Sequence, residues 1–507
     1  MKKLIYLVLF TPLFSFSQFG GDSLFNTSQV IRVDLTFNQI GFWDSLVANY
    51  PTETNMIAAG LQITDIYGVH NMDSIEIRLK GNSSYGHPGN KKSFKIDINK
   101  VVQGQNYEGL KKLNFNNGFK DPTFMREKLY SDVCKAMGVP APRVNYANVY
   151  MNGTFWGFYT VVEQIDDQFL EWAILEDQGN LFKAGDNSDG QTPADLMNYG
   201  STASAYTTRY ELKTNTVTND WTDLITLITD INASSAANFE TTFNLNFDKT
   251  KYLRTLALDN LFSSLDSYLN SARNYYLYHN TVTTKWEWIK WDGNEAFGLY
   301  TGGPGLGSLE TLAPNYIAAN RPLVSKVFAN SNLYEAYKTE MCAIMDTYFN
   351  STYMDNLATT IKNLIQTDVT NDVNKMYTTQ NFIDNVEGNT TISGGPMGSQ
   401  TVFGLKSFVA NRYAYLQTAV CSNLGIEEEN STQIVVSPNP FENEINLKGK
   451  ISAIEIVDLM GKLIDFEVIL KEENMMRIKI NASKGYYILK FSENGTQKSI
   501  NLVKLND

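Results

Sequence analysis

The chain has 507 residues, 43% of them hydrophobic and 19% charged, and its formal net charge is −12 at pH 7. This length accommodates two to four domains with a substantial core, and the composition is that of a globular protein rather than a disordered one. The acidic balance argues against binding nucleic acid or anionic lipid through bulk charge, although it leaves room for local basic patches.

The amino-terminal sequence MKKLIYLVLFTPLFSFSQ has the pattern of a secretory signal peptide. Two lysines precede an apolar run over residues 4–16, and small serines lie before a cleavage site at Gln18. The run is too short for a membrane anchor, and no other run approaches the length that spans a bilayer. We therefore expect a signal peptide over residues 1–17, a lead-in over 18–30, and a soluble mature protein outside the cytoplasm with no transmembrane anchor.

The first part of the chain reads as an antiparallel sheet. Apolar and polar residues alternate in LQITDIYG and SIEIRLKG, which is typical of half-buried strands. RVNYANVYMNGTFWGFYTVVEQI is expected to form a hairpin with Asn152-Gly153 at its turn. DPTFMREKLYSDVCKAMG is expected to be a helix that begins near Asp121 and Pro122 and ends at Gly138.

Helical spacing dominates later in the chain. It predicts helices over residues 251–269 and over most of 321–422, with strands between them in RNYYLYHNTVTTKWEWIKWDG. The polar sequence GDNSDGQTPADLMNYGSTAS is expected to be a surface loop. An early sheet followed by helices indicates an α+β domain over residues 31–422.

The composition changes near GIEEENSTQ, so we expect a solvated linker over residues 423–433. Beyond it, short strand-like runs and an Asn494-Gly495 turn predict a small all-β domain over residues 434–507, of a size that suits a β-sandwich.

Cysteine and histidine are scarce, with three residues of each. One disulfide and one free thiol are possible among Cys134, Cys342 and Cys421, but three buried, unpaired thiols are the favoured expectation. Histidine-rich metal sites and Ser-His-Asp hydrolysis are poorly supplied. Catalysis is therefore expected to depend on carboxylates and lysines.

The hairpin sequence RLKGNSSYGHPGNKKSFKIDI is the first candidate site. Gly81 can take a positive φ, and Asn82, Ser83 and Ser84 place short polar groups beside backbone N–H donors. If Phe94 and Ile96 fill the core, Lys95 points to the opposite face, where it could pair with phosphate oxygens. A lysine-rich exposed hairpin is the alternative, and the spacing alone favours it.

A second candidate site lies in SSLDSYLNSARNYYLYHNTVTTKWEWIKWDGNEAFG. Asp266 ends a helical run, Asn274 comes eight residues later, and Asp292 ends an aromatic-rich strand. Carboxylate and amide oxygens suit a divalent cation, and a nearby Asp could orient an attacking hydroxyl. The alternative is that both Asp residues only cap turns. Glu127 could be a site residue, but an exposed surface Glu is the alternative that the sequence alone favours, and Glu163 has the same ambiguity.

Several motifs in this order resemble the CotH kinase family. They are RLKGNSS, KKSFKI, DPTFMREKL, MGVPAPR, YMNGTFWGFYTVVEQID, NLFKA, SARNYYLYH and WDGNEAFG, within approximately residues 31–420. The resemblance implies an atypical protein-kinase-like fold that binds ATP with Mg²⁺ or Mn²⁺ and phosphorylates protein hydroxyls.

The resemblance also implies roles for individual residues. Residues 81–84 would cover the phosphates, and Lys95 would be the phosphate-binding lysine, with Lys92 as runner-up. Glu127 would be its ion-pair partner, and Asp266 would orient the substrate hydroxyl. The resemblance further implies that Asn274 and Asp292 are metal ligands, and Glu163 is a candidate nucleotide-contacting residue.

Two departures from the family pattern concern the site. Family members often carry a second Asp two residues after the position of Asp292, where this chain has Asn294. A neutral amide binds a metal less strongly than a carboxylate does. The second departure is an insertion between Lys183 and Tyr210.

The carboxy-terminal region resembles the type A sorting domain of the type IX secretion system. The motifs are VSPNPFENEINL, IVDLMGKLI, KGYYILKF and KSINLVKL. This resemblance implies the secretion machinery as a partner, export across the outer membrane, and attachment to the cell surface or release.

Three function classes are compatible with the sequence. The first is an exported protein kinase with an unknown protein substrate, for which the scarcity of extracellular ATP is the difficulty. The second is a surface binding or adhesion protein that uses the kinase-like fold as a scaffold, since fold alone does not establish activity. The third is a secreted hydrolase, but the sequence contains no G-x-S-x-G motif that would support this class.

Overall fold

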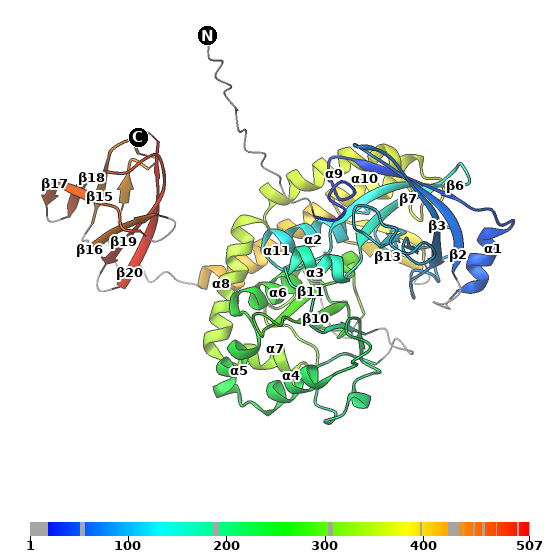
Figure 1. Ribbon diagram of the computed structural model, residues 1–507, viewed down its shortest axis with the longest axis horizontal. Coiled ribbons are helices and arrows are strands. Elements are labelled where there is room, and N and C mark those ends of the chain that lie inside the picture. The colour runs from blue at the N-terminus through cyan, green and yellow to red at the C-terminus, as the bar shows by residue number, and fades with distance from the viewer. Residues whose placement is uncertain are drawn as a thin grey trace, which may run out of the picture. The chain divides into compact units, whose positions relative to one another are not determined.

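A computed structural model describes most of the chain, and its described residues form two compact units that divide after residue 424 (Figure 1). The described ranges are 19–50, 56–185, 192–302, 308–395, 398–423, 435–439, 441–449, 452–458, 462–472, 474–493 and 496–505. The predicted signal peptide, almost all of the predicted linker and the predicted Asn494-Gly495 turn lie outside them.

The first unit begins with a seven-stranded antiparallel sheet that closes into a barrel through a parallel pairing of its first and sixth strands. In spatial order the strands are β1 (Val30–Thr36), β2 (Ile57–Asp65), β3 (Gly68–Leu79), β4 (Phe94–Asp97), β5 (Lys112–Asn116), β7 (Thr154–Glu163) and β6 (Val144–Met151). Alternate residues of β1, such as Ile31, Val33 and Leu35, fill the interior of the barrel. The predicted hairpin at Asn152-Gly153 is β6–β7.

A smaller four-stranded sheet follows, in the order β11 (Trp286–Lys290), β10 (Tyr275–His279), β8 (Leu181–Ala184) and β9 (Tyr210–Leu212). The helices are α1 (Phe42–Asn49), α2 (Arg126–Ala136), α3 (Asp167–Ala173), α4 (Thr222–Ala233), α5 (Phe239–Asn246), α6 (Lys249–Leu261), α7 (Pro322–Ala329), α8 (Ser331–Thr347), α9 (Ser351–Asn371), α10 (Thr379–Glu387) and α11 (Leu405–Ala419). A hairpin of β12 (Thr390–Gly395) and β13 (Gly398–Val402) lies between α10 and α11. Mixed helices and sheets are therefore confirmed for this unit.

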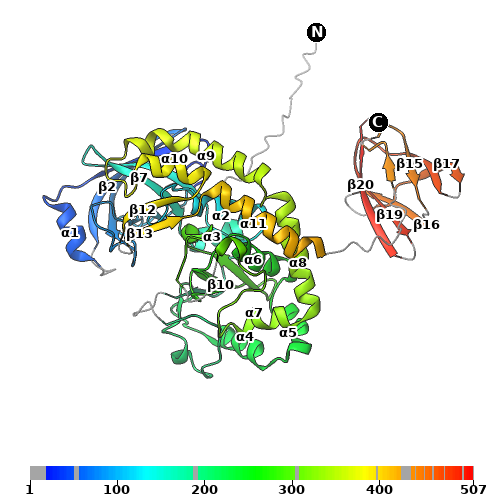
Figure 2. The same ribbon diagram turned by 180° about the vertical axis from the view of Figure 1, so that it is seen from behind.

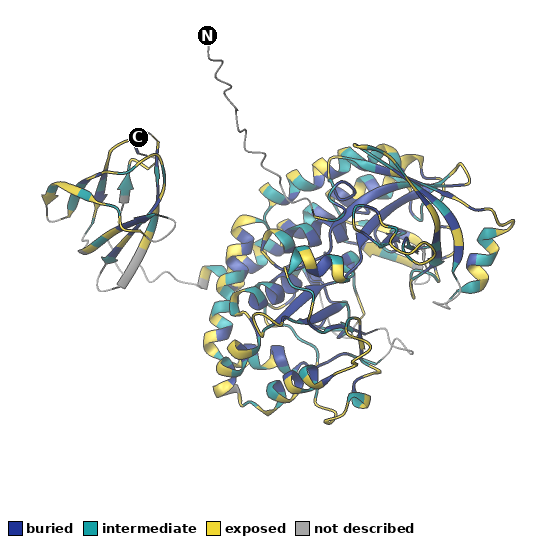
Figure 3. Ribbon diagram, in the orientation of Figure 1, coloured by how far each residue is buried: buried dark blue, intermediate teal, exposed yellow. Residues whose placement is uncertain are grey.

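The helices bury one face and expose the other, as Figure 3 shows by their alternating dark blue and yellow. The helix α9 carries buried residues at Met354, Ala358, Ile361 and Ile365, which are three or four positions apart and therefore share one face. Figure 2 shows α9 and α10 beside the barrel, and Asn148 of β6 donates to Asp368 of α9 at 2.7 Å. The late helices thus cover part of the early sheet.

One sequence prediction about local structure is wrong, and another is confirmed only in part. The helix α2 begins at Arg126 and not at Asp121, because the Asp121 carboxylate accepts hydrogen bonds from the backbone N–H groups of Thr123 and Arg126 and so shapes a turn before the helix. The predicted surface loop has no helix or strand over residues 192–202 and is exposed over 198–202, as expected. It is buried at Ala194 and Leu196, however, where the Ala194 N–H donates to Ala272 O at 2.9 Å.

The expectation of three unpaired thiols is also wrong. Cys342 of α8 and Cys421, just after α11, form a disulfide across 79 residues of sequence, and only Cys134 is a free, buried thiol. Counting cysteines in the sequence could not choose between these states, because the pairing depends on the short turn after α11 packing against α8.

The carboxy-terminal unit is entirely β among its described residues. One antiparallel sheet contains β14 (Val435–Ser437), β15 (Glu444–Lys448), β18 (Met475–Ile480) and β17 (Phe466–Glu472), and the other contains β16 (Ser452–Asp458), β19 (Gly485–Glu493) and β20 (Thr496–Lys504). One apolar core takes residues from both sheets, including Leu447, Ile478, Ile456 and Leu489. The all-β prediction is confirmed, and the sandwich arrangement stays a prediction.

Within the described part of the chain, we find no helix that combines the length and the apolar character needed to cross a bilayer.

A buried ion pair attaches the loop between β3 and β4 to the end of α9. Lys91 and Asp372 are both almost fully buried, and the Lys91 ammonium donates to the Asp372 carboxylate. Asp372 also accepts from the backbone N–H of Phe158 in β7 at 3.0 Å. Burial lowers the pKa of Lys91 to about 8, and the neighbouring Asp372 charge opposes that shift. The loop is therefore fixed to both the barrel and the helices.

We expect Asp372→Asn to lower the free energy of unfolding by about 3–5 kcal/mol, because it leaves a buried lysine charge without its partner. The measurement is urea denaturation of the full chain. Asp34→Asn is the matched control, since it breaks the exposed Arg32–Asp34 pair, which spans 2.7 Å, and should cost under about 1 kcal/mol. Equal losses in the two variants would contradict an anchoring role for Asp372.

Candidate active site

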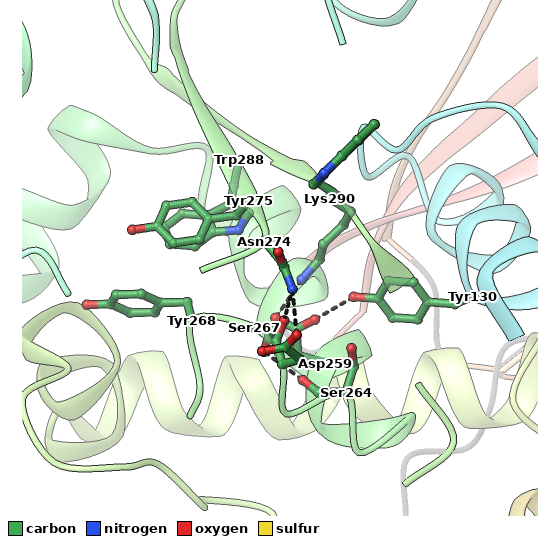
Figure 4. A pocket seen from close by; sticks show the side chains of 11 residues that line it. Tyr130, Asp259, Ser264, Ser267, Tyr268, Asn274, Tyr275, Trp288 and Lys290 are labelled. Carbon is green, nitrogen blue, oxygen red and sulfur yellow. Dashed lines mark hydrogen bonds and ion pairs between the residues drawn. The ribbon is translucent and has the colours of Figure 1, made fainter. Parts of the chain in front are cut away.

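Asp266 and Asn274 come together in the segment between α6 and β10. The predicted helix does not extend to residue 269, because α6 ends at Leu261 and Ser263 takes a left-handed conformation with φ 43°. Asn274 is also left-handed, and its Nδ2 donates to both the main-chain oxygen and Oδ2 of Asp266 at 2.9 Å (Figure 4). This directs the amide oxygen of Asn274 away from Asp266 and leaves it available as a ligand.

Asp292 lies directly after β11, in a left-handed conformation with φ 56°, and begins the 3₁₀ turn η3 (Gly293–Glu295). The turn passes close to α2, because a Cβ at Gly293 would lie 2.4 Å from Cδ1 of Tyr130. Glycine is therefore required at position 293 for Asp292 to approach α2 this closely.

Glu127 of α2 faces Lys80, the residue that follows β3. The Glu127 carboxylate is buried and accepts from Asn116 Nδ2 at 2.8 Å, while the Lys80 ammonium donates to Asn114 Oδ1 at 3.1 Å. Burial and the negative charge of Asp292 raise the pKa of Glu127. Burial lowers the pKa of Lys80, against the opposing charges of Asp292 and Glu127. These shifts place Lys80, Glu127 and Asp292 within electrostatic reach of one another.

Glu295 adds a further carboxyl group. It is buried and pairs with Lys120, whose ammonium donates to Glu295 Oε2 at 2.7 Å. Burial raises the pKa of Glu295 to about 7, and the negative charges of Asp266 and Asp292 act in the same direction while Lys120 opposes them. The charges of Asp266 and Asp292 therefore both act on the Glu295 carboxyl group.

Lys95 does not form the expected ion pair with Glu127. After burial, the groups with the largest effect on its pKa are four cations, namely Lys112, Arg78, Lys80 and Lys213, and together these lower the pKa to about 7. No described residue forms a hydrogen bond or an ion pair with the Lys95 ammonium. The alternation of side chains along β4 correctly predicted that Lys95 lies outside the apolar core. Lys80, however, is the lysine on which the charges of Glu127 and Asp292 act.

The predicted phosphate-covering loop is exposed at Gly81, Asn82 and Ser83. Gly81 has φ 100°, and a Cβ there would lie 2.1 Å from Oγ of Ser84, so the backbone requires glycine. Lys92 holds this loop together, because its ammonium donates to the main-chain oxygens of Tyr85 and His87 at 2.7 and 2.5 Å. The contacts of Lys92 are thus structural ones.

Glu163 does not join the other predicted residues. Its Oε1 accepts from Arg143 at 2.5 Å and from the Trp172 indole at 2.9 Å, and its Oε2 accepts from Arg143 Nε at 3.1 Å. The next side chain, Gln164, points the other way and accepts from Asn114, the residue that binds Lys80. Successive side chains at the end of β7 therefore divide between a structural ion pair and the site.

The described residues contain no group of three or more His, Cys, Asp or Glu side chains that could hold a metal ion. Mg²⁺ is commonly bound by one or two carboxylates together with substrate phosphates, so Asp292 and the Asn274 amide oxygen fit such a cation when a nucleotide supplies further oxygens. A cavity lined by Asn274 and Asp266 has a volume of about 10 Å³ (Figure 4), so a nucleotide would lie outside it.

The comparison with known families decides the relationship that the motifs suggested. A family model described as CotH kinase protein matches residues 77–416, which is more than half of the chain. This chain belongs to the CotH kinase protein family. A second model, described as a secretion system C-terminal sorting domain, matches residues 435–504. Both resemblances predicted from the sequence are confirmed.

Curated relatives of this CotH family chain include inner spore coat protein H of Bacillus subtilis, which is 27% identical over 56% of this chain and 75% of that protein. Two invasins of Rhizopus delemar, CotH2 and CotH3, are 23% and 24% identical over 64% and 49% of this chain. The chain spans only 54% and 43% of the length of these two invasins.

Among solved structures, the Helicobacter pylori proinflammatory kinase CtkA aligns with 51% of this chain and 88% of its own, at 7% identity and a TM-score of 0.22. A score this low carries no argument about the CotH domain.

Sequence reasoning missed three charged residues of the CotH domain, namely Lys80, Lys120 and Glu295. Lys80 lies inside the quoted motif RLKGNSS and Glu295 inside WDGNEAFG, so motif position was a signal for both. No sequence signal pointed to Lys120, because its partner Glu295 lies 175 positions away in the chain.

We expect the amine of Lys95 to titrate near pH 7, about three units below an ordinary lysine, because it is buried among cations. Its labelling by acetic anhydride, followed by peptide mass spectrometry, should level off above that pH. Between about pH 7 and 10 the folded protein binds fewer protons here than the unfolded chain, so the contribution of Lys95 to stability rises with pH. Labelling that still climbs toward pH 10 would contradict this.

Proposed function

We propose that this protein is an exported atypical protein kinase, which transfers the γ-phosphate of ATP to Ser or Thr hydroxyls of a protein substrate with Mg²⁺ or Mn²⁺. Two observations carry the proposal: Asn274 holds the Asp266 carboxylate, and Lys80, Glu127 and Asp292 act electrostatically on one another. The carboxyl of Glu295 links the two groups, because the charges of both Asp266 and Asp292 act on it. Family membership supports the same activity, with an atypical protein-kinase-like fold for residues 31–422.

Asp266 is the proposed catalytic base. Its carboxylate is held by Asn274 Nδ2 at 2.9 Å, which fixes its direction and leaves the second oxygen for a substrate hydroxyl. In the transfer, the hydroxyl oxygen forms a bond to the γ-phosphorus, the bond from that phosphorus to the bridging oxygen breaks, and ADP leaves. The hydroxyl proton passes to Asp266.

Asp292 and the amide oxygen of Asn274 are the proposed metal ligands, and the half-buried Asn294 is near enough in sequence to assist. A bound divalent cation supplies positive charge that offsets the negative charge of the phosphates. Its affinity depends on few protein ligands, so it should bind together with ATP rather than alone.

The lysines Lys80 and Lys95 are the proposed phosphate-binding groups, with residues 81–84 as the covering loop. Both amines have lowered pKa values in the free protein, and a triphosphate would raise them by favouring the charged form. The tightly held Lys92 is the less favoured candidate, because its ammonium already binds two main-chain oxygens.

The route of export is also proposed. Residues 1–17 would direct passage across the inner membrane, and the sorting domain at 434–507, joined by a linker at 423–433, would engage the type IX secretion machinery. The mature protein would then be secreted or attached to the cell surface.

We expect Asp266→Ala and Asp292→Ala each to lower phosphate transfer by about 10²–10⁴-fold, since one removes the proposed base and the other a metal ligand. The measurement is transfer of label from ATP to casein, or to the protein itself, by the secreted form with Mg²⁺ or Mn²⁺. The control is Asp346→Asn, an exposed change on α8.

The scaffold alternative makes the opposite prediction. If the protein acts only as a surface binding protein, the wild type should transfer no label and should bind no ATP in the presence of metal by calorimetry. Label that is incorporated equally by the wild type and both Ala variants would mean that other residues carry the reaction.

We expect Lys80→Met and Lys95→Met each to raise KM for ATP about 10-fold or more, because each removes a charged donor to phosphate. Lys100→Met, in an exposed turn, is the control and should leave KM unchanged. The measurement is the KM for ATP of the wild type and the three variants, from steady-state kinetics at pH 7. An effect in Lys80→Met alone would reassign the phosphate-binding role from Lys95 to Lys80.

A further inference from the structure

One buried carboxylate, Asp259 in the last turn of α6, contacts two other elements of the CotH domain. Its Oδ1 accepts from the hydroxyl of Tyr130 in α2, and its Oδ2 pairs with the ammonium of Lys290 at the end of β11 at 2.7 Å (Figure 4). Lys290 also donates to Thr255 O in α6 at 3.0 Å. All three side chains of this triad, Tyr130, Asp259 and Lys290, are buried.

Each member of the triad is close in sequence to a proposed site residue. Tyr130 lies three positions after Glu127 on α2, so it follows Glu127 by about one helical turn. Lys290 precedes Asp292 by two residues, and Asp259 lies seven residues before Asp266. The triad therefore joins the three segments that carry Glu127, Asp266 and Asp292.

We propose that Asp259, Tyr130 and Lys290 are positioning residues, which fix the spacing between the catalytic Asp266 and the metal ligand Asp292. The effect of the triad on phosphate transfer rests on the proposed kinase function. Its structural role in holding the three segments together does not depend on that function. Asp259 is buried and both of its oxygens accept from triad members, so its contacts are within the protein rather than with substrate.

The chemistry of the triad fits a positioning role. A buried ion pair adds little net stability compared with apolar side chains of similar size, but it fixes direction and register when its hydrogen bonds are satisfied. Phosphoryl transfer depends on in-line placement, and a displacement of about 1 Å can cost about 100-fold in rate. The small cavity between the triad and Asp266 is lined by Ser264 and Ser267 and leaves little space for Asp266 to shift.

The first test is Tyr130→Phe, which removes one hydroxyl and keeps the ring. The matched control is Tyr337→Phe. Tyr337 lies on α8, is also buried, and donates a single hydrogen bond to Pro314 O at 2.6 Å. We expect Tyr130→Phe to lower kcat about 10-fold with KM for ATP within about 2-fold, a split that general destabilisation does not produce. Tyr337→Phe should leave kcat within about 2-fold of the wild type.

The second readout is hydrogen exchange of the full chain, which needs no activity. Tyr130→Phe should speed exchange in residues 263–274 and 291–299 relative to Tyr337→Phe. A second variant, Asp259→Asn with Lys290→Met, removes the charges of Asp259 and Lys290 together and keeps an amide oxygen as acceptor for Tyr130. Faster hydrogen exchange should then be confined to residues 291–299.

Equal exchange and equal kcat in Tyr130→Phe and Tyr337→Phe would overturn the inference. If the wild type transfers no phosphate but the exchange pattern is as expected, the kinase proposal fails while the positioning of these segments by the triad is supported.

Discussion

The gathering of carboxyl groups around Asp292 is the constraint on which the rest of the first unit depends. Glu127 and Glu295 are buried, and the charge of Asp292 raises the pKa of each. Carboxylates this close repel one another in a medium of low dielectric constant, so the fold must supply compensating cations. Lys80 comes from the end of β3 and Lys120 from the turn before α2. Lys80 and Lys120 thus supply positive charge to a cluster whose negative charge comes from α2 and from the segment that follows β11.

Buried polar contacts also connect the barrel with the helices. The Lys91–Asp372 pair holds the loop after β3 against the end of α9, and the turn before α2 is held by Arg126, which contacts Asn385 at 2.9 Å. Each contact sets the position of an element that carries a charged site residue. The apolar cores supply the main driving force for folding, and these ion pairs select one arrangement of the charged segments.

How much the sequence could predict depended on the range of the contact involved. The β6–β7 hairpin and the pairing of Asp266 with Asn274 involve neighbours in sequence, so alternation and motif order were sufficient. The assignment of Lys95 as partner of Glu127 failed because strand parity gives the face of a residue but not its distance from another element. Likewise, the disulfide and the Lys120–Glu295 pair join positions that only tertiary packing brings together.

The Cys342–Cys421 disulfide also affects how mechanical force is transmitted through the chain. The carboxy-terminal unit is connected to the rest of the chain through the residues that follow α11. A pull applied through that connection would, without the disulfide, act on the end of α11 alone and could peel the helix away turn by turn. Because Cys421 is bonded to α8, the load passes at once into a second, 17-residue helix, one face of which is buried. Tension on the carboxy-terminal unit is therefore resisted as shear between α8 and the helices α6 and α7 that pack against it.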